Sequence, residues 1–193
     1  MTRLILASSS PYRRELLQRL QLDFACISPD IDESCRENEP PAAYVQRLAH
    51  EKAAEISRHH PDAIVIGSDQ CSVNHGNILG KPKDRDHAIE QLTAASGQSI
   101  EFLTGVSIQH HESGRQHEWM DTFTVTFRDL KRAEIERYLD AEQPYNCAGS
   151  FKSEQLGISL CQSMQGDDPS AFCASCPASL NRPRRKNAPA CKI

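Results

Sequence analysis

Residues 63–70, with the sequence AIVIGSDQ, decide the fold class of this chain. The run Ala63–Gly67 is continuous and β-branched, which is typical of a strand buried on both faces of a sheet. Ser68, Asp69 and Gln70 follow it, so we expect them at the carboxyl end of the strand, where open α/β sheets collect ligands. A carboxylate there can hold a hard divalent cation or polarise a water molecule. The alternative is that Asp69 is an ordinary turn residue.

The segment Ser8–Arg14, SSSPYRR, lies at the expected junction between a strand over Arg3–Ala7 and a helix. Pro11 is typical of the first helical position, and the serine before it is typical of an N-cap. Free N–H groups at the start of the helix, serine hydroxyls and arginine side chains together suit a phosphate group. The alternative is that the serines only cap the helix and the arginines are solvated.

Helical and strand patterns alternate along the rest of the chain. Apolar residues recur with a helical period over residues 42–57, 84–95 and 129–140. Strand patterns cover residues 24–28, 100–110, 117–128 and 157–161, and His75-Gly76 marks a hairpin between residues 71–73 and 77–79. This order predicts a single α/β (α+β) domain.

The composition is that of an ordinary globular protein. The chain has 193 residues, of which 38% are hydrophobic, and this content argues against disorder as the dominant state. It lacks an apolar run long enough to cross a membrane, and Leu4–Ala7 is too short for a signal peptide, so we expect a cytoplasmic protein without a membrane partner. The net charge of −4 argues against a nucleic-acid partner.

Three isolated charged residues are candidates for a site. Glu33 lies in an acidic loop, Lys52 lies in the middle of a predicted helix, and Lys81 lies in the tight loop Gly80-Lys81-Pro82. A lysine can neutralise phosphate as a point charge. Each residue taken alone is more simply read as a solvated surface charge, and only the combination points to a site.

Residues 169–193 differ from the rest of the chain. They hold four of the eleven prolines, three of the eight cysteines and five Lys/Arg residues without an Asp or Glu. One interpretation is a flexible basic tail, and the other, which we favour, is a shift of the reading frame near Pro169. Cys173 and Cys176 form a C-x-x-C pair without a second pair, so we expect no zinc site.

Several short motifs occur in the order found in the Maf family of nucleoside triphosphate pyrophosphatases, which this chain resembles. They are LILASSSPYRRELL at 4–17, the Glu33 loop, HEKA at 50–53, VIGSDQ at 65–70, LGKP at 79–82, LTGV at 103–106 and the strand pattern at 122–127. The resemblance implies a Maf/ITPase-like fold, with a central mixed twisted sheet flanked by helices and a nucleotide-binding cleft. It covers roughly residues 3–168, within a single predicted domain over residues 1–168, and residues 169–193 depart from the family's closing segment.

The resemblance also implies a reaction in which water attacks the α-phosphorus of a nucleotide and diphosphate leaves. Asp69 matches the family's acid/base residue, which takes a proton from the attacking water. Glu33 and Asp69 are implied to share a Mg²⁺ or Mn²⁺ ion, since both offer hard oxygen ligands. Lys52 and Lys81 are implied to stabilise charge on the phosphates.

The phosphate chain itself is implied to lie at the start of the first helix. Ser8 and Ser9 would hold it through their hydroxyls and the adjacent N–H groups. Arg13 would grip a phosphate through its guanidinium. The family resemblance further implies a homodimer.

Three positions that separate subfamilies are occupied by Tyr12, Gln70 and Glu154. Members that prefer dTTP and UTP typically carry Arg, Thr and Gln there, whereas this set resembles the subfamily that hydrolyses 7-methyl-GTP. N7-methylation makes the guanine base cationic, which suits the carboxylate of Glu154 and the aromatic face of Tyr12. The alternative for Tyr12 is a hydrogen bond to the base through its hydroxyl. The alternatives are the same reaction on dTTP, UTP or another modified nucleotide, or a nucleotide-binding regulator of cell division with little turnover.

Overall fold

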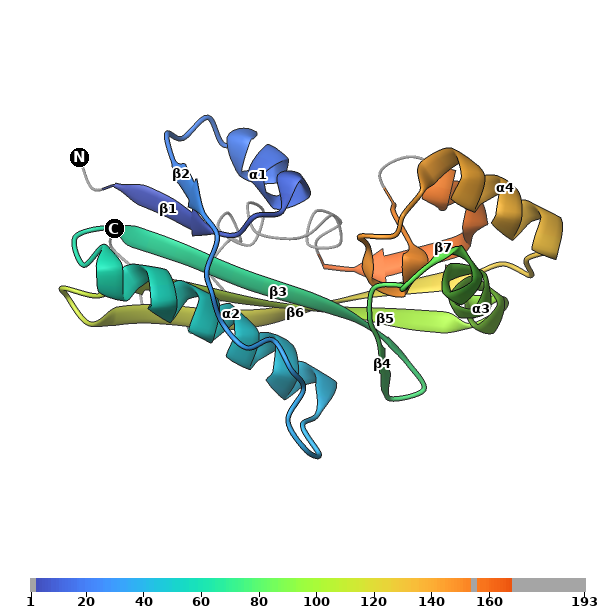
Figure 1. Cartoon of the computed structure of the whole chain (residues 1–193), viewed down its shortest axis with the longest axis horizontal. Helices are drawn as coiled ribbons and strands as arrows, with labels where there is room; N and C mark the ends of the chain where they lie inside the picture. The colour runs from blue at the N-terminus through green and yellow to red at the C-terminus, as the bar shows by residue number, and fades with distance from the viewer. Residues whose placement is uncertain (1–2, 154–155, 168–193) are drawn as a thin grey trace.

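The computed structural model describes residues 3–153 and 156–167. Its centre is a seven-stranded mixed sheet with the strand order β2-β1-β3-β5-β6-β7, and β4 pairs with β3 beside this path. The long strands β3, β5 and β6 run through the molecule, with α1 and α2 on opposite sides of β3 and with α3 and α4 near one end (Figure 1). This architecture confirms the expected α/β class. In the described part of the chain, every helix is too short or too polar to span a membrane.

The bounds of the elements agree with most of the sequence pattern. The helices are α1 (Pro11–Gln18), α2 (Pro41–His59), α3 (Arg85–Ala95) and α4 (Arg132–Glu142), with 3-10 turns η1 (Ala148–Ser150) and η2 (Leu156–Leu160). The strands are β1 (Leu4–Ala7), β2 (Ala25–Ile27), β3 (Ile64–Asn74), β4 (Asn77–Leu79), β5 (Ser99–His110), β6 (Arg115–Phe127) and β7 (Cys161–Gly166).

The parallel pair β1 and β3 determines where the sheet opens. The two strands pair in register as far as Ala7 opposite Gly67. β1 ends there, whereas β3 continues to Asn74 because its other edge stays paired with the antiparallel strand β5. The prediction that the strand ends before Asp69 was therefore wrong, because Asp69 lies in mid-strand opposite Gly105. The opening exists because the neighbouring strand stops, and not because β3 does.

Different helices cover the two faces of β3. Val65 belongs to a buried cluster with Ala53 of α2, whereas Ile66 belongs to a cluster with Leu17 of α1. Side chains alternate between the faces of a strand, so every second residue from Val65 onward faces α2. Asp69 therefore points to the α2 face.

Two glycines allow α2 to lie against the sheet. A Cβ atom at Gly67 would lie 2.3 Å from the carbonyl oxygen of Ala49, and one at Gly105 would lie 2.4 Å from that of Val45. Such distances are far below a van der Waals contact, so a larger residue would push the helix away. The close approach lets Lys52 of α2 reach Asp69.

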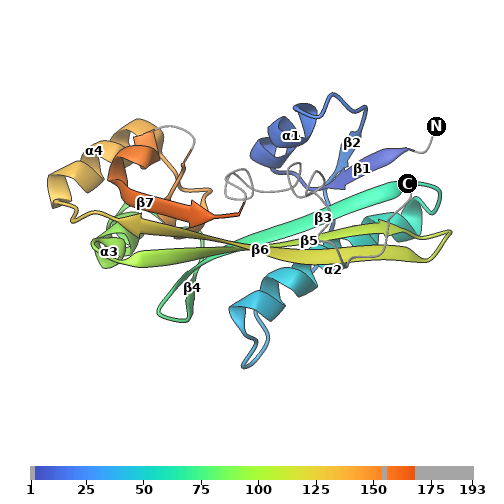
Figure 2. The same cartoon turned by 180° about the vertical axis from the view of Figure 1, so that it is seen from behind.

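The other end of the long strands carries a second core. α3, α4 and β7 surround a buried cluster in which the rings of Phe127 and Phe151 meet edge to face, with centroids 5.0 Å apart. Figure 2 shows α3, α4 and β7 at one end of the long strands and α1, β1 and β2 toward the other. The region between the two ends is accordingly bounded by segments that are distant in sequence.

The hairpin prediction is confirmed, but the start of α4 differs from the prediction. β3 and β4 pair around His75 and Gly76, whose φ angles of 47° and 79° match the left-handed geometry that short hairpin turns require. α4 does not begin at Asp129. Lys131 is its N-cap, because the Glu134 side chain accepts from the Lys131 backbone N–H.

The predicted strand over residues 157–161 is also wrong. Gly157 lies in a 3-10 turn, where a Cβ atom would be 2.0 Å from the carbonyl oxygen of Lys152. Pairing with β6 starts only at Cys161, opposite Phe127, so the strand is β7. The expected atypical tail over 169–193 lies outside the described residues.

Candidate active site

A cleft of about 560 Å³ opens beside β3 where β1 ends. Its lining comes from the turn before α1, the loop before α2, the middle of β3, the loop after β4 and the segment before η2. It contains every described residue that the sequence analysis singled out: Ser8, Ser9, Tyr12, Arg13, Glu33, Lys52, Asp69, Gln70 and Lys81. Glu154, the remaining candidate, lies outside the described residues. The fold thus brings scattered candidates into one volume, of the size that small-molecule sites have.

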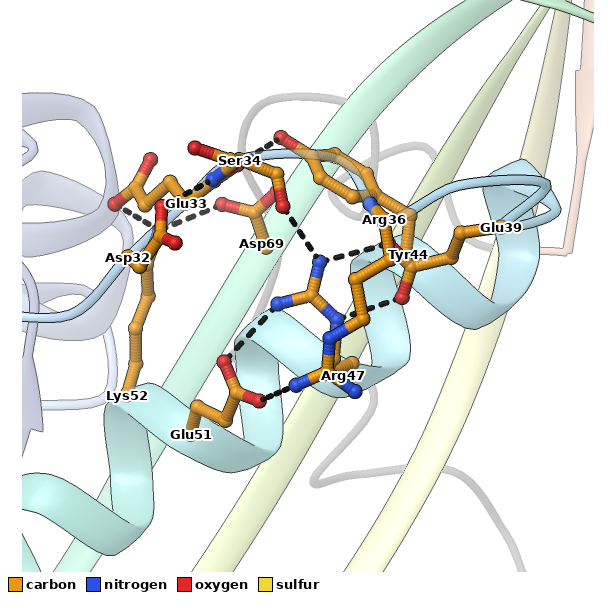
Figure 3. Close-up of polar contacts among 10 residues, drawn as sticks. All are labelled: Asp32, Glu33, Ser34, Arg36, Glu39, Tyr44, Arg47, Glu51, Lys52 and Asp69. Carbon is orange, nitrogen blue, oxygen red and sulfur yellow. Dashed lines mark hydrogen bonds and ion pairs between the residues drawn. The ribbon is translucent and has the colours of Figure 1, made fainter.

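An ammonium group between two carboxylates forms the centre of the cleft (Figure 3). Lys52 Nζ lies 2.7 Å from Asp69 Oδ1 and 2.8 Å from Glu33 Oε1. The side chains of Lys52 and Asp69 are 8% and 12% exposed, whereas that of Glu33 is 56% exposed. Two of the charges are therefore held by packed elements, and the third reaches them from a loop.

The donor set suits a hard divalent cation that is completed by the substrate. Glu33 and Asp69 offer carboxylate oxygens at one point, and Mg²⁺ commonly binds one or two carboxylates together with phosphate oxygens and water. Within residues 3–153 and 156–167, no cluster of three or more His, Cys, Asp or Glu side chains could hold a metal without such help. The chemistry of the two carboxylates fits Mg²⁺ or Mn²⁺ in this role.

The start of α1 presents donors to the cleft. Ser10 accepts a hydrogen bond from the backbone N–H of Arg13 at 3.4 Å, which confirms Ser10 as the N-cap. The Ser8 side chain accepts from the Ser10 N–H at 3.1 Å and is buried. Arg13 Nε is buried, and the part of the chain that the structure describes offers it no hydrogen-bond partner. A buried N–H without a partner is costly, so an anion in the cleft would relieve it.

Lys81 is the second cation that is available to a ligand. It lies in the loop after β4, and it forms no ion pair with the described residues. The loop is anchored at Gly80, whose carbonyl oxygen accepts from Gln91 Nε2 at 3.1 Å and from the Gly149 N–H at 3.2 Å. Lys81 and Arg13 therefore add to the cleft positive charge that the described residues do not neutralise.

Another part of the cleft is lined by Tyr12, Gln70 and Lys152, and it suits a flat ring. Lys152 Nζ lies 5.7 Å from the centroid of the Tyr12 ring, and it lies 3.4 Å from a carboxylate oxygen of Glu142. Gln70 Nε2 donates to Thr104 Oγ1 at 2.9 Å, which fixes the amide. The sequence analysis did not identify Lys152, although its position two residues before Glu154 was a usable signal.

Two further lining residues were missed. Tyr44 donates its hydroxyl to the Glu33 carbonyl oxygen at 3.0 Å, and burial, followed by the charges of Asp69 and Glu33, raises its pKa to about 12. The spacing of Tyr44 and Lys52, two helical turns apart, was the signal for a shared face. Burial, then the charge of Asp69, raises the pKa of Cys71 to about 12, so this thiol stays protonated and does not act as a nucleophile.

The fold and the cleft together define an α/β protein whose cleft presents Arg13 and Lys81 together with a Lys–Asp–Glu centre. The profile of the family described as "Maf-like protein" matches residues 3–171. The chain belongs to this family, which confirms the resemblance found in the sequence.

Relatives with assigned names are similar over most of their length. One protein, named 7-methyl-GTP pyrophosphatase, from Alcanivorax borkumensis, is 56% identical over 88% of this chain and 86% of its own. Another of that name, from Pseudomonas syringae pv. tomato, is 55% identical over 89% of this chain and 90% of its own. A solved structure, a HAM1 protein from Coxiella burnetii, superposes with a TM-score of 0.47 and 14% identity, covering 83% of this chain and 98% of the other.

Proposed function

We propose that the protein hydrolyses 7-methyl-GTP to 7-methyl-GMP and diphosphate. The observation that carries this proposal is the Lys52 ammonium between Asp69 and Glu33, in a cleft that also presents Arg13 and Lys81. The arrangement combines a carboxylate that can act as a base, two carboxylates that can hold a metal ion, and two further cations that can bind phosphate groups. Two relatives named 7-methyl-GTP pyrophosphatase, which match over 86% and 90% of their own length, support the choice of substrate.

In this reaction, Asp69 would be the residue that accepts a proton. Its carboxylate would accept a proton from the water that attacks the α-phosphorus, and Lys52 would hold that carboxylate in place from 2.7 Å. Hydrolysis expels diphosphate, whose charge grows as the bond breaks. Arg13 and Lys81, which also line the cleft, would stabilise that charge.

We assign Glu33 and Asp69 as the residues that would hold a magnesium or manganese ion. When bound, such an ion neutralises phosphate charge and polarises the phosphoryl group. Lys52 would keep its contact with Asp69 while its ammonium also faces the phosphates.

The assigned base specificity rests on Tyr12, Gln70 and Glu154. The Tyr12 ring lines the cleft, and its aromatic face suits a cationic base such as 7-methylguanine. Gln70 offers an amide that can read a base edge. The role of Glu154, like the proposed homodimer and cytoplasmic location, stays a prediction from the sequence.

The test is release of diphosphate from 7-methyl-GTP, GTP, dTTP and UTP with Mg²⁺ or Mn²⁺. We expect 7-methyl-GTP to give the highest kcat/KM, and Asp69→Asn to abolish turnover. The matched control is Asp62→Asn, which changes an exposed carboxylate near the start of the same strand and should leave the rate unchanged. Preference for a pyrimidine nucleotide would overturn the specificity, and nucleotide binding without turnover would favour the regulator instead.

A further inference from the structure

We propose that Arg47 is a positioning residue for the reaction. It fixes the loop over residues 28–40 so that the Glu33 side chain reaches Lys52. This inference rests on the proposed function, since it gives Glu33 a part in hydrolysis. The loop joins β2 to α2 without a helix or strand of its own. Such a segment needs specific contacts to hold a single conformation, because ordering each residue costs conformational entropy.

The side chain of Glu33 is not fixed by burial. It is 56% exposed, and its contact with Lys52 is an ion pair at 2.8 Å. An exposed ion pair alone stabilises a loop only weakly. The position of the Glu33 carboxylate must therefore come from the backbone that carries it.

That backbone is held at two successive carbonyl groups by residues of α2. Tyr44 donates its hydroxyl to the Glu33 carbonyl oxygen at 3.0 Å. Arg47 Nη2 donates to the Ser34 carbonyl oxygen, also at 3.0 Å. The Arg47 guanidinium lies 5.6 Å from the centroid of the Tyr44 ring, so the two donors also support one another. Figure 3 shows both side chains reaching the loop from the helix that carries Lys52.

Arg47 is itself fixed by a bidentate pair. Its Nε and Nη2 atoms lie 2.6 Å and 2.7 Å from the two carboxylate oxygens of Glu39, at the far end of the loop. Its Nη1 atom donates to Glu51 at 3.1 Å. The side chains of Arg47 and Glu39 are 12% and 8% exposed, so water competes little for these bonds. One guanidinium thus joins the middle and the end of the loop to α2.

The geometry requires arginine rather than any cation. A planar guanidinium offers five N–H donors in a fixed fork, whereas an ammonium is a single compact point. Lysine at position 47 would keep the charge beside Glu39 and Glu51, but it could not bind Glu39 at two oxygens and the Ser34 carbonyl at once. Arg47→Lys therefore separates charge from positioning.

The experiment is a double-mutant cycle between Arg47 and Glu33, with 7-methyl-GTP hydrolysis as one readout. We expect Arg47→Met to lower kcat/KM by about 100-fold and Arg47→Lys by about 10-fold, since a misplaced reacting group costs such factors. In a Glu33→Gln background, each change should alter kcat/KM by less than about twofold. Equal losses in both backgrounds would overturn the proposal, as would full activity of Arg47→Met alone.

A second readout does not depend on turnover. Amide hydrogen exchange of residues 30–39 should speed up at least about tenfold in both Arg47 variants, while the amides of β3 and β5 keep their protection. The matched control is Arg58→Met, which removes an exposed arginine of the same helix that pairs with Glu55. Unchanged exchange in the loop would overturn the proposal. If the wild type hydrolyses no nucleotide, the proposed function fails, and the exchange result still decides the role of Arg47 in the loop.

Discussion

The two sides of the cleft hold their charges in different ways. Lys52 and Asp69 come from the helix α2 and the strand β3, and both side chains are nearly buried. Glu33 comes from a loop, and its side chain is mostly exposed. On the first side, packing at Gly67 and Gly105 fixes the charges, whereas on the second side hydrogen bonds to the loop backbone do so. A charge on a loop can thus be placed as definitely as one on a strand, but through hydrogen bonds to the backbone that carries it.

The largest effect on activity is expected from removing the ammonium group of Lys52. Lys52→Met should lower kcat by about 10³-fold or more, because it removes the group that orients Asp69 and faces the phosphates. Glu33→Gln, on the loop side, should lower kcat by about 10- to 100-fold, since the Lys52–Asp69 pair remains. The measurement is steady-state diphosphate release. Lys83→Met, an exposed lysine near the cleft, serves as the control. A greater loss for Glu33→Gln than for Lys52→Met would reverse the comparison.

The side of the cleft formed by α2 and β3 should also be sensitive to a single added methyl group. Gly67→Ala would place Cβ within 2.3 Å of the Ala49 carbonyl oxygen, so α2 must shift. We expect the free energy of unfolding to fall by about 1–3 kcal/mol, as overpacking usually causes. Urea denaturation measures it. Gly80→Ala is the matched control, because no atom lies within 4 Å of its added Cβ, and equal destabilisation of the two variants would contradict the close approach.

The loop side should respond to loss of one hydroxyl. Tyr44→Phe removes only the hydrogen bond to the Glu33 carbonyl oxygen and keeps the ring beside Arg47. A hydrogen bond of this kind contributes about 0.5–1.5 kcal/mol, so kcat/KM should fall by about 2- to 12-fold. The loss should vanish in a Glu33→Gln background. An equal loss there would mean that Tyr44 acts through the cleft itself.

The smallest effect is a pH dependence at Glu39. The hydrogen bond from Arg47 lowers the pKa of Glu39 from 4.5 to about 2, in spite of an opposing contribution from burial. A depressed folded-state pKa stabilises the fold fully above pH 4.5, and the stabilisation is lost as the pH falls toward 2. The difference in unfolding free energy between wild type and Glu39→Gln should therefore shrink over that range. Urea denaturation at several pH values measures it, and a difference that does not change with pH would count against the pairing.

A suitable control for this titration lies on the same loop. Glu37 is exposed, so Glu37→Gln should show a difference from wild type that is small at every pH. A pH-dependent difference of the same size at both positions would indicate a general charge effect rather than the pairing of Glu39 with Arg47.

The local sequence pattern predicted the backbone geometry correctly where a few adjacent residues determine that geometry. The β-branched run before Gly67, the helical period over α2 and the His75-Gly76 turn each specify their own backbone geometry, and all three were predicted correctly. The pattern failed at the end of β3 and at residues 157–161. In both places the cause is pairing with a strand from elsewhere in the chain, β5 or β6.

The order of short motifs along the chain was sufficient to assign the family, because each motif constrains a backbone turn or a charged side chain in a way that few sequences satisfy together. The meeting of Glu33, Lys52 and Asp69 at one point depended on the packed fold. Their approach requires β1 to end beside β3, α2 to lie against Gly67, and Arg47 to hold a loop that has no regular structure. Those contacts join segments that are far apart in sequence, so no local window contains the energies that favour them.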